Sequence, residues 1–161
     1  MSTIRVAWGS ATGPTEMSSF DAALAEAGVH NYNLVTLSSV IPAEARLERV
    51  GTAPDLGPTG EALYAVVGRE TLAPGADGEA CAGLGWVRSE SGRGLFYEAS
   101  GTDSDAVAEA VEAGLRRGTE LREWDFREEP EVVVESTPAD PTDHATAVVV
   151  AAYGGSESLL D

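Results

Sequence analysis

Two adjacent serines, Ser38 and Ser39, lie between two apolar segments of the chain. The first segment, residues 34–37, is strand-like, and the second leads directly into Pro42. No glycine or aspartate flanks the doublet, which argues against an ordinary surface loop. Serines at a strand end often satisfy local backbone groups, but a hydroxyl that is held in place is also a potential nucleophile. The doublet alone does not distinguish a structural strand end from a nucleophile, so the surrounding sequence is needed.

Two carboxylates are the other candidates for chemistry. Glu98 follows the apolar residues 95–97, and a carboxylic acid can donate a proton near neutral pH when an apolar pocket raises its pKa. A glutamate that ends a strand and faces water is the simpler interpretation of the same pattern. Asp21 is expected in the first turn of a helix, where a negative charge stabilises the helix dipole by about 0.3–1 kcal/mol.

Metal and phosphate sites are not indicated by the sequence. Cys81 is the only cysteine, so we expect no internal disulfide and no cysteine-based metal site, and its apolar neighbours predict a buried packing role. His30 and His144 are far apart and belong to no metal-binding motif, so we expect both to be solvent-accessible or hydrogen-bonded. The segment GSATG lacks the lysine and the spacing of a phosphate-binding loop.

Hydrophobic periodicity predicts the elements that would position these residues. A serine cap followed by apolar residues at helical spacing predicts a helix that ends at Gly28, and a second helix is expected from Ser104 to Gly118. We expect residues 9–16 to form a loop and residues 42–60 to form a long connection. Strands are predicted over residues 3–8, 34–37, 63–67, 80–87, 94–99, 131–135 and 145–152.

The order of these elements indicates the α+β class. Two helices are too few for a doubly wound sheet, and the polar turn at residues 88–93 predicts a hairpin. We therefore expect a four-layer αββα sandwich, in which two mainly antiparallel sheets pack together and a helix covers each outer face. With 161 residues, the chain is expected to form a single domain, residues 1–161.

The chain is strongly acidic. It has 27 acidic and 10 basic residues, a formal net charge of -17, and every basic residue is an arginine. Nucleic acid is a poor partner for such a surface, and no apolar run reaches the roughly 18 residues of a membrane helix. An acidic patch for a cationic partner is one explanation of the charge, but the acidic residues are spread along the chain. We therefore expect a halophilic, cytoplasmic protein that functions at a high salt concentration.

Several blocks of the sequence together resemble the pyruvoyl-dependent arginine decarboxylases. They occur in the family's order, and they are GSATGPTEMSSFDAALAEAG, NYNLVTLSSVIP, GLFYE at residues 94–98 and GTELREW at residues 118–124. The most specific block is the second, for its spacing of asparagines, leucine, serine doublet and proline. Two residues depart from the family pattern, because His30 stands where a glycine is common and Ala43 where a second proline often occurs.

The resemblance implies that the chain cuts itself between Ser38 and Ser39. The Ser39 hydroxyl would attack the Ser38 carbonyl, and β-elimination would then leave a β chain, residues 1–38, and an α chain, residues 39–161. Residue 39 would become a covalent pyruvoyl group, which forms a Schiff base with the substrate's α-amine and takes up the electrons released with carbon dioxide. Asn33 matches the family's asparagine, whose amide would polarise the Ser38 carbonyl during self-processing.

The resemblance also assigns roles to the two carboxylates. Glu98 would protonate the decarboxylated intermediate, and Asp21 would face the guanidinium of the substrate. The implied function is a zymogen that processes itself into an enzyme converting L-arginine to agmatine and CO2 for polyamine biosynthesis. We expect a homotrimer of processed units, or a dimer of trimers, with active sites between subunits. Two alternatives stay open: an uncleaved, non-catalytic paralogue that acts as a binding or regulatory subunit, and a pyruvoyl decarboxylase for another amino acid.

Overall fold

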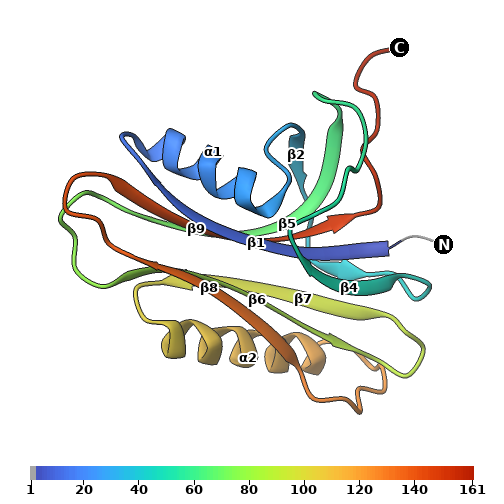
Figure 1. Ribbon diagram of the computed structural model, residues 1–161. Coiled ribbons are helices and arrows are strands. Elements are labelled where there is room, and N and C mark those ends of the chain that lie inside the picture. Colours follow the sequence, from blue (N-terminus) through green and yellow to red (C-terminus); the bar gives the residue numbers. More distant parts are fainter. Residues whose placement is uncertain (1–2) are drawn as a thin grey trace.

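Two β-sheets pack face to face between two helices in the computed structural model, which describes residues 3–161 (Figure 1). The layers are α1, a five-stranded sheet, a four-stranded sheet and α2, which confirms the predicted αββα sandwich. The elements in chain order are β1 (Thr3–Gly13), α1 (Glu16–Ala27), β2 (Asn33–Thr36), β3 (Val40–Ile41), β4 (Arg46–Gly51), β5 (Ala62–Leu72), β6 (Glu79–Arg88), β7 (Gly94–Gly101), α2 (Ser104–Glu120), β8 (Glu131–Pro138) and β9 (His144–Tyr153).

The two sheets differ in how their strands pair. The five-stranded sheet has the order β2-β5-β9-β1-β4, with an antiparallel centre and a parallel strand at each edge. The four-stranded sheet has the order β3-β7-β6-β8 and is antiparallel throughout. Its centre is the predicted hairpin of β6 and β7. Consequently β2 and β3, which are consecutive in sequence, are edge strands of different sheets.

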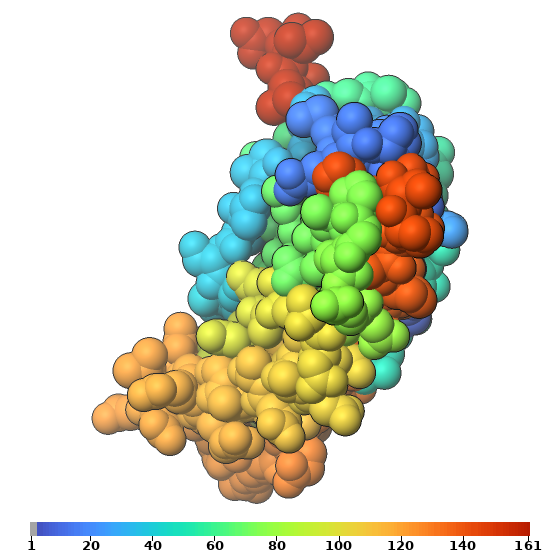
Figure 2. Space-filling model, turned by 90° about the vertical axis from the view of Figure 1, so that its left-hand side faces the viewer, coloured from blue at the N-terminus to red at the C-terminus, as the bar shows by residue number. Residues whose placement is uncertain are grey.

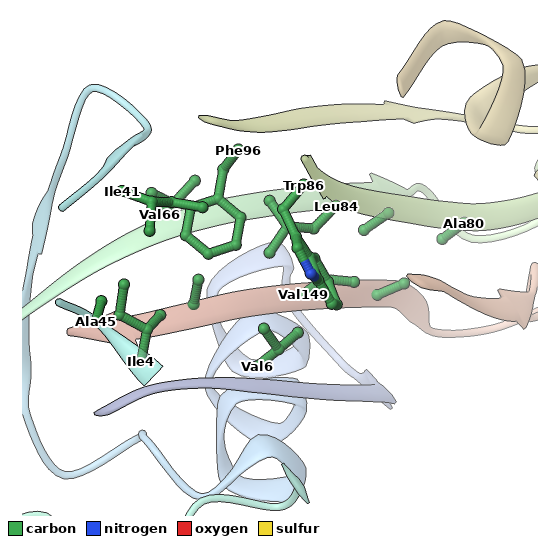
Figure 3. Packing of buried hydrophobic residues seen from close by; sticks show 13 residues of the cluster. Ile4, Val6, Ile41, Ala45, Val66, Ala80, Leu84, Trp86, Phe96 and Val149 are labelled. Carbon is green, nitrogen blue, oxygen red and sulfur yellow. The ribbon is translucent and has the colours of Figure 1, made fainter. Parts of the chain in front are cut away.

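The central strand β9 explains why the sandwich is stable. It is buried on both faces, because one set of its side chains packs against α1 and the alternate set packs against the four-stranded sheet. The inter-sheet core is built around Trp86, Phe96 and Val149, which meet between the sheets in Figure 3. A third cluster, which includes Val111 and Leu115, attaches α2 to the outer face of the four-stranded sheet.

The start of α1 differs from the prediction. Thr15, not a serine, is the N-cap: its hydroxyl accepts from the Ser18 N–H at 3.0 Å, and the Ser18 hydroxyl accepts from the Thr15 N–H at 3.0 Å. This capping box starts the helix at Glu16, so Asp21 lies in the second turn. The predicted first-turn role of Asp21 at the helix dipole is therefore wrong. The predicted end is confirmed, since Gly28 closes α1 with a left-handed φ of 81°.

Two predicted connections contain strand instead. Residues 9–13 continue β1, because their small side chains serve close packing: a Cβ atom at Gly9 would overlap the backbone and side chains of α1. Residues 46–51, inside the expected connection 42–60, form β4 along the edge of β1. Its many charged residues obscured the strand pattern. The second helix also continues two residues past Gly118, to Glu120.

Candidate active site

The serine doublet lies where the chain crosses from one sheet to the other. β2 ends at Thr36 on the edge of the five-stranded sheet, and β3 begins at Val40 on the edge of the four-stranded sheet. Residues 37–39, which we call the crossover, join these two edges. In Figure 2 the light-blue segment that contains them runs along one side of the molecule, above the orange end of α2.

Hydrogen bonds anchor the crossover at both ends. The Leu37 N–H donates to the Ala65 carbonyl at 2.9 Å, and the Phe96 N–H donates to the Ser39 carbonyl at 2.8 Å. The Tyr153 hydroxyl donates to the Val40 carbonyl at 2.7 Å. Burial raises the pKa of Tyr153 well above its usual range, so this donor keeps its proton. The peptide between the two serines is thus held from both sheets.

Ser39 has a strained backbone. Its φ is 74°, and among residues 3–161 it is the only non-glycine residue with a positive φ. Such a conformation costs a residue with a side chain on the order of 1–3 kcal/mol and persists only where the surrounding structure imposes it. Here the Phe96 hydrogen bond and the short strand β3 impose it. This strained residue is Ser39, the residue that the sequence predicted as the nucleophile.

Ser38, Ser39 and Glu98 share one pocket of about 450 Å³, which we call the serine pocket. The Ser39 hydroxyl donates to a carboxylate oxygen of Glu98 at 3.3 Å. The remaining walls come from β7, from the C-terminal half of α2, which includes Arg117, and from the residues directly after that helix, which include Arg122. Residues 59 positions apart are therefore brought into direct contact.

The surroundings of Glu98 differ from the expected apolar pocket. Successive side chains of a strand point to opposite faces, and Leu95 packs on the α2 side while Phe96 packs between the sheets. Glu98 projects from the same face as Phe96, at the open end of the inter-sheet core, and its side chain is exposed. Gly68 of β5 leaves room for it, because a Cβ there would lie 3.3 Å from the Glu98 Cβ.

Asn33 and Asp21 lie away from the serine pocket within the chain. The Asn33 side-chain amide donates to the Gly60 carbonyl at 2.8 Å, at the opposite end of β2 from the doublet. A four-residue strand spans on the order of 13 Å, which is beyond the reach of an asparagine side chain. The structure therefore does not bring the Asn33 amide to the Ser38 carbonyl of the same chain.

A second pocket, of about 460 Å³, is lined by Asn33 and by neighbours of Asp21. We call it the α1 pocket, and its walls are Phe20, Leu24, Tyr32, Asn33, Leu34, Thr36, Val67 and Arg69. Asp21 is exposed on α1, directly after Phe20 and three residues before Leu24. The α1 pocket and the serine pocket have no residue in common. Helices α1 and α2, which line them, are on opposite sides of the sandwich (Figure 1).

The other titratable candidates are structural. Cys81 is buried as predicted, and burial raises the pKa of its thiol. His30 is exposed, whereas His144 is half-buried and its Nδ1 has no hydrogen-bond partner within residues 3–161; the expectation for His144 is therefore only partly met. In the same range of residues, no group of three or more acidic, histidine or cysteine side chains is placed to hold a metal ion. None of the described helices is long and apolar enough to cross a membrane.

Sequence reasoning missed three residues of the serine pocket and its surroundings. Arg122 lies in the GTELREW block, so the resemblance pointed to its segment without giving it a role. Arg117 and Gly68 carried no signal, because one is an ordinary charge on a helix and the other an ordinary strand glycine. Only the packing of α2 and β5 around β7 shows that both are near the crossover.

Known proteins are similar to this chain in sequence over most of their length. Residues 3–158 match the family model described as pyruvoyl-dependent arginine decarboxylase. A protein of that name from Halobacterium salinarum is 51% identical over 163 residues, which cover 100% of this chain and 99% of the relative. Proteins of the same name from Thermococcus sibiricus and Methanocaldococcus jannaschii are 38% and 30% identical, over 88% and 84% of this chain and 89% and 81% of those relatives.

These matches place the chain among enzymes that depend on a covalently bound pyruvoyl group. More narrowly, it belongs to the pyruvoyl-dependent arginine decarboxylase family.

Proposed function

We propose that this protein is an arginine decarboxylase that makes its pyruvoyl group from Ser39 by cutting its own chain after Ser38. The observation that carries the proposal is the state of Ser39: a left-handed backbone, a carbonyl held by Phe96, and a hydroxyl 3.3 Å from the Glu98 carboxylate. A residue that can become a pyruvoyl group must be a serine at a peptide bond open to attack. Ser39 fits this requirement, because it is strained, anchored and lines a pocket.

The self-cleavage begins with attack of the Ser39 Oγ on the Ser38 carbonyl carbon. Transfer of the acyl group from nitrogen to oxygen replaces the peptide by an ester and frees the Ser39 amine. Loss of the Cα proton of residue 39 then breaks the Cβ–O bond, which leaves a carboxylate on Ser38 and a dehydroalanine at residue 39. Hydrolysis of that group releases ammonia and leaves the ketone. The strained φ of Ser39 favours the first step, because leaving the peptide relieves it.

The pyruvoyl group supplies a carbonyl that accepts the electrons released when the carboxylate of arginine leaves as CO2. The role of the chain is then to return a proton to the carbon that lost the carboxylate. Glu98 is proposed as the donor, because its carboxylate is already within hydrogen-bond distance of residue 39. Addition of one proton and loss of one CO2 convert arginine into agmatine.

Recognition of the guanidinium is assigned to Asp21, which requires a second copy of the chain. Asp21 and Asn33 lie beside the α1 pocket, whereas Ser39 and Glu98 line the serine pocket, so one chain holds only part of the proposed site. Large apolar side chains around the crossover are exposed, which suits contact with a neighbouring subunit. They are Val35, Val40, Tyr97 and Leu121.

A trimer, or a dimer of trimers, would complete the site by placing the α1 pocket of one subunit against the serine pocket of the next. Such contact would also surround Glu98 with protein. We place the enzyme in the cytoplasm, because its acidic composition suits an interior rich in salt.

Mass spectrometry of the purified protein tests the proposal directly. We expect two chains, residues 1–38 and residues 39–161, with a blocked N-terminus on the larger one. Ser39→Ala should remain a single chain, since alanine has no oxygen for the acyl transfer. Ser38→Ala is the matched control, because it keeps both the attacked carbonyl and the nucleophile, and it should still be cut. A Ser39→Ala protein that splits after residue 38 would rule out this mechanism.

A further inference from the structure

Self-cleavage would change the charge of the serine pocket, and the inference that follows rests on that proposed step. In the intact chain Ser38 is joined to Ser39 by a neutral peptide. After cleavage Ser38 carries a free carboxylate, which stays in the pocket because β2 holds the preceding residues to β5. The processed pocket therefore has to accommodate a negative charge that the precursor does not have.

The surroundings would otherwise repel this carboxylate. Glu98 is a second carboxylate of the same pocket, in contact with Ser39. The wall formed by Gly118 and Leu121 is the C-terminal end of α2, where the unpaired carbonyl groups concentrate negative charge. The chain as a whole has a formal net charge of -17. A nearby cation is the direct way to stabilise a new carboxylate here.

Two arginines, Arg117 and Arg122, are the cations of the serine pocket, and they differ in how firmly they are held. Arg122 is half-buried; its Nη1 donates to the Gly118 carbonyl at 3.0 Å, and its guanidinium lies 5.5 Å from the centre of the Trp124 ring. Arg117 is exposed and has no side-chain hydrogen bond or ion pair within the described part of the chain. A preordered side chain loses less entropy on binding than a mobile one.

We propose that Arg122 binds the carboxylate that self-cleavage creates at Ser38, with Arg117 as an auxiliary cation at the pocket wall. A guanidinium has five N–H donors, and a single donor of Arg122 is engaged by an acceptor within residues 3–161. The remaining donors can form the paired contact that a carboxylate favours. Arg122 would then fix the end of the β chain, keep it from folding over residue 39 and hold the two chains together.

The carboxylate of the substrate is the other anion that could reach this pocket. An ion pair with an arginine would stabilise that group before it leaves as CO2 and would disappear in the transition state, which raises the barrier. The carboxylate of Ser38 does not react further, so a strong ion pair with it has no such cost. The chemistry therefore favours Ser38 as the partner of Arg122.

The experiment compares Arg122→Met in two backgrounds, the processed protein and the uncut Ser39→Ala protein, by thermal unfolding in molar salt without arginine. In the uncut background the substitution removes only the contacts with Gly118 and Trp124. In the processed background it also removes the partner of the Ser38 carboxylate. We expect the melting temperature to fall by at least about 4 °C more in the processed protein than in the uncut one. Arg122→Lys, which keeps the charge, should restore part of the difference.

Arg116→Met is the control, because Arg116 neighbours the pocket residues on α2 but does not line the pocket; it should act equally in both backgrounds. An equal loss of melting temperature for Arg122→Met in the two backgrounds would overturn the proposal. So would a raised KM for arginine without the extra loss, which would assign Arg122 to the substrate's carboxylate. If the Arg122→Met protein is not cut, although Arg122→Met folds in the Ser39→Ala background, then Arg122 acts earlier, in self-cleavage itself. Failure of the unaltered protein to be cut would instead refute the proposed self-cleavage.

Discussion

The hydrogen bond between Ser39 and Glu98 places one glutamate where it could act in two steps, self-cleavage and turnover. In the intact chain its carboxylate accepts from the Ser39 hydroxyl at 3.3 Å, and in the proposed mechanism it would face the group formed from the same residue after cleavage. The two steps have different demands, because cleavage needs a free hydroxyl on Ser39 whereas turnover needs a proton donor. Substitution of Glu98 separates them.

We predict that Glu98→Gln still forms both chains but loses turnover by about 10²- to 10⁴-fold, the usual contribution of a positioned acid. The amide keeps the size and can accept from Ser39, but it cannot deliver a proton. Denaturing gels measure the cleavage, and agmatine release measures turnover. Wild-type turnover would mean that the proton comes from another group, and an uncut protein would mean that Glu98 also assists the attack by Ser39.

Stabilisation of the helix dipole does not explain Asp21, because this residue is in the second turn of α1 and Glu16 occupies the first. We predict that Asp21→Asn raises the KM for arginine about 10- to 150-fold, as expected for a charged hydrogen bond worth roughly 1.5–3 kcal/mol. Asp105→Asn, an exposed aspartate in the first turn of α2, is the control and should leave the KM unchanged. Normal arginine binding by Asp21→Asn would remove the support for Asp21 as the guanidinium contact.

At the scale of elements, the serine pocket depends on how closely α2 approaches β7. Gly114 of α2 sits directly on the ring of Tyr97, and a Cβ added there would overlap that ring. Gly118, one turn later, is less crowded, since a Cβ added there would meet only a terminal methyl carbon of Leu95, at 2.9 Å. Both glycines line the serine pocket, so the helix spacing set by Gly114 also sets the pocket's width.

This difference predicts opposite effects of the same substitution. Alanine in a helix is favoured over glycine by about 1 kcal/mol, but overpacking costs about 1–3 kcal/mol. Gly114→Ala should therefore lower the melting temperature by several degrees and reduce activity, because Tyr97 must move. Gly118→Ala should keep or raise the melting temperature, since the end of the Leu95 side chain can turn aside. Equal stability of the two variants, measured by thermal unfolding, would show that the contact between α2 and β7 is not tight.

At the scale of the whole molecule, charge repulsion is the dominant electrostatic feature. The net charge is -17, and the ion pairs within residues 3–161 involve only Arg49 and Arg127, both exposed. Exposed pairs contribute roughly 0–1 kcal/mol each, which leaves most of the repulsion unbalanced. Dissolved ions must therefore screen it.

We predict that the melting temperature falls steeply between 1 M and 0.01 M salt, because the range of the repulsion grows from about 3 Å to about 30 Å. Calorimetry at a series of KCl concentrations measures this. Sucrose of equal osmolarity is the control, since it stabilises by exclusion from the surface but does not screen charge. A melting temperature that is independent of salt would contradict the halophilic interpretation.

The sequence by itself determined the layers and pointed to Ser39 as the candidate nucleophile. Alternating apolar residues fixed most strands, the pattern at Val107, Val111 and Leu115 fixed the buried face of α2, and the blocks around Ser38 and Ser39 gave the family. These features are local, so each can be read from a short window. The sequence failed at Gly9 and at β4, where small or charged residues owe their conformation to the strand or helix packed against them.

Only the tertiary structure decided which candidate residues meet. Ser39 and Glu98 are 59 residues apart, and their contact depends on β3 pairing with β7 after the chain has crossed between the sheets. The same crossover imposes the left-handed φ of Ser39, which no residue type signals. Asn33 is close to Ser38 in sequence, yet β2 holds them apart, because an extended strand carries its ends away from each other. Contacts between distant segments follow from sheet pairing, and local sequence does not encode that pairing.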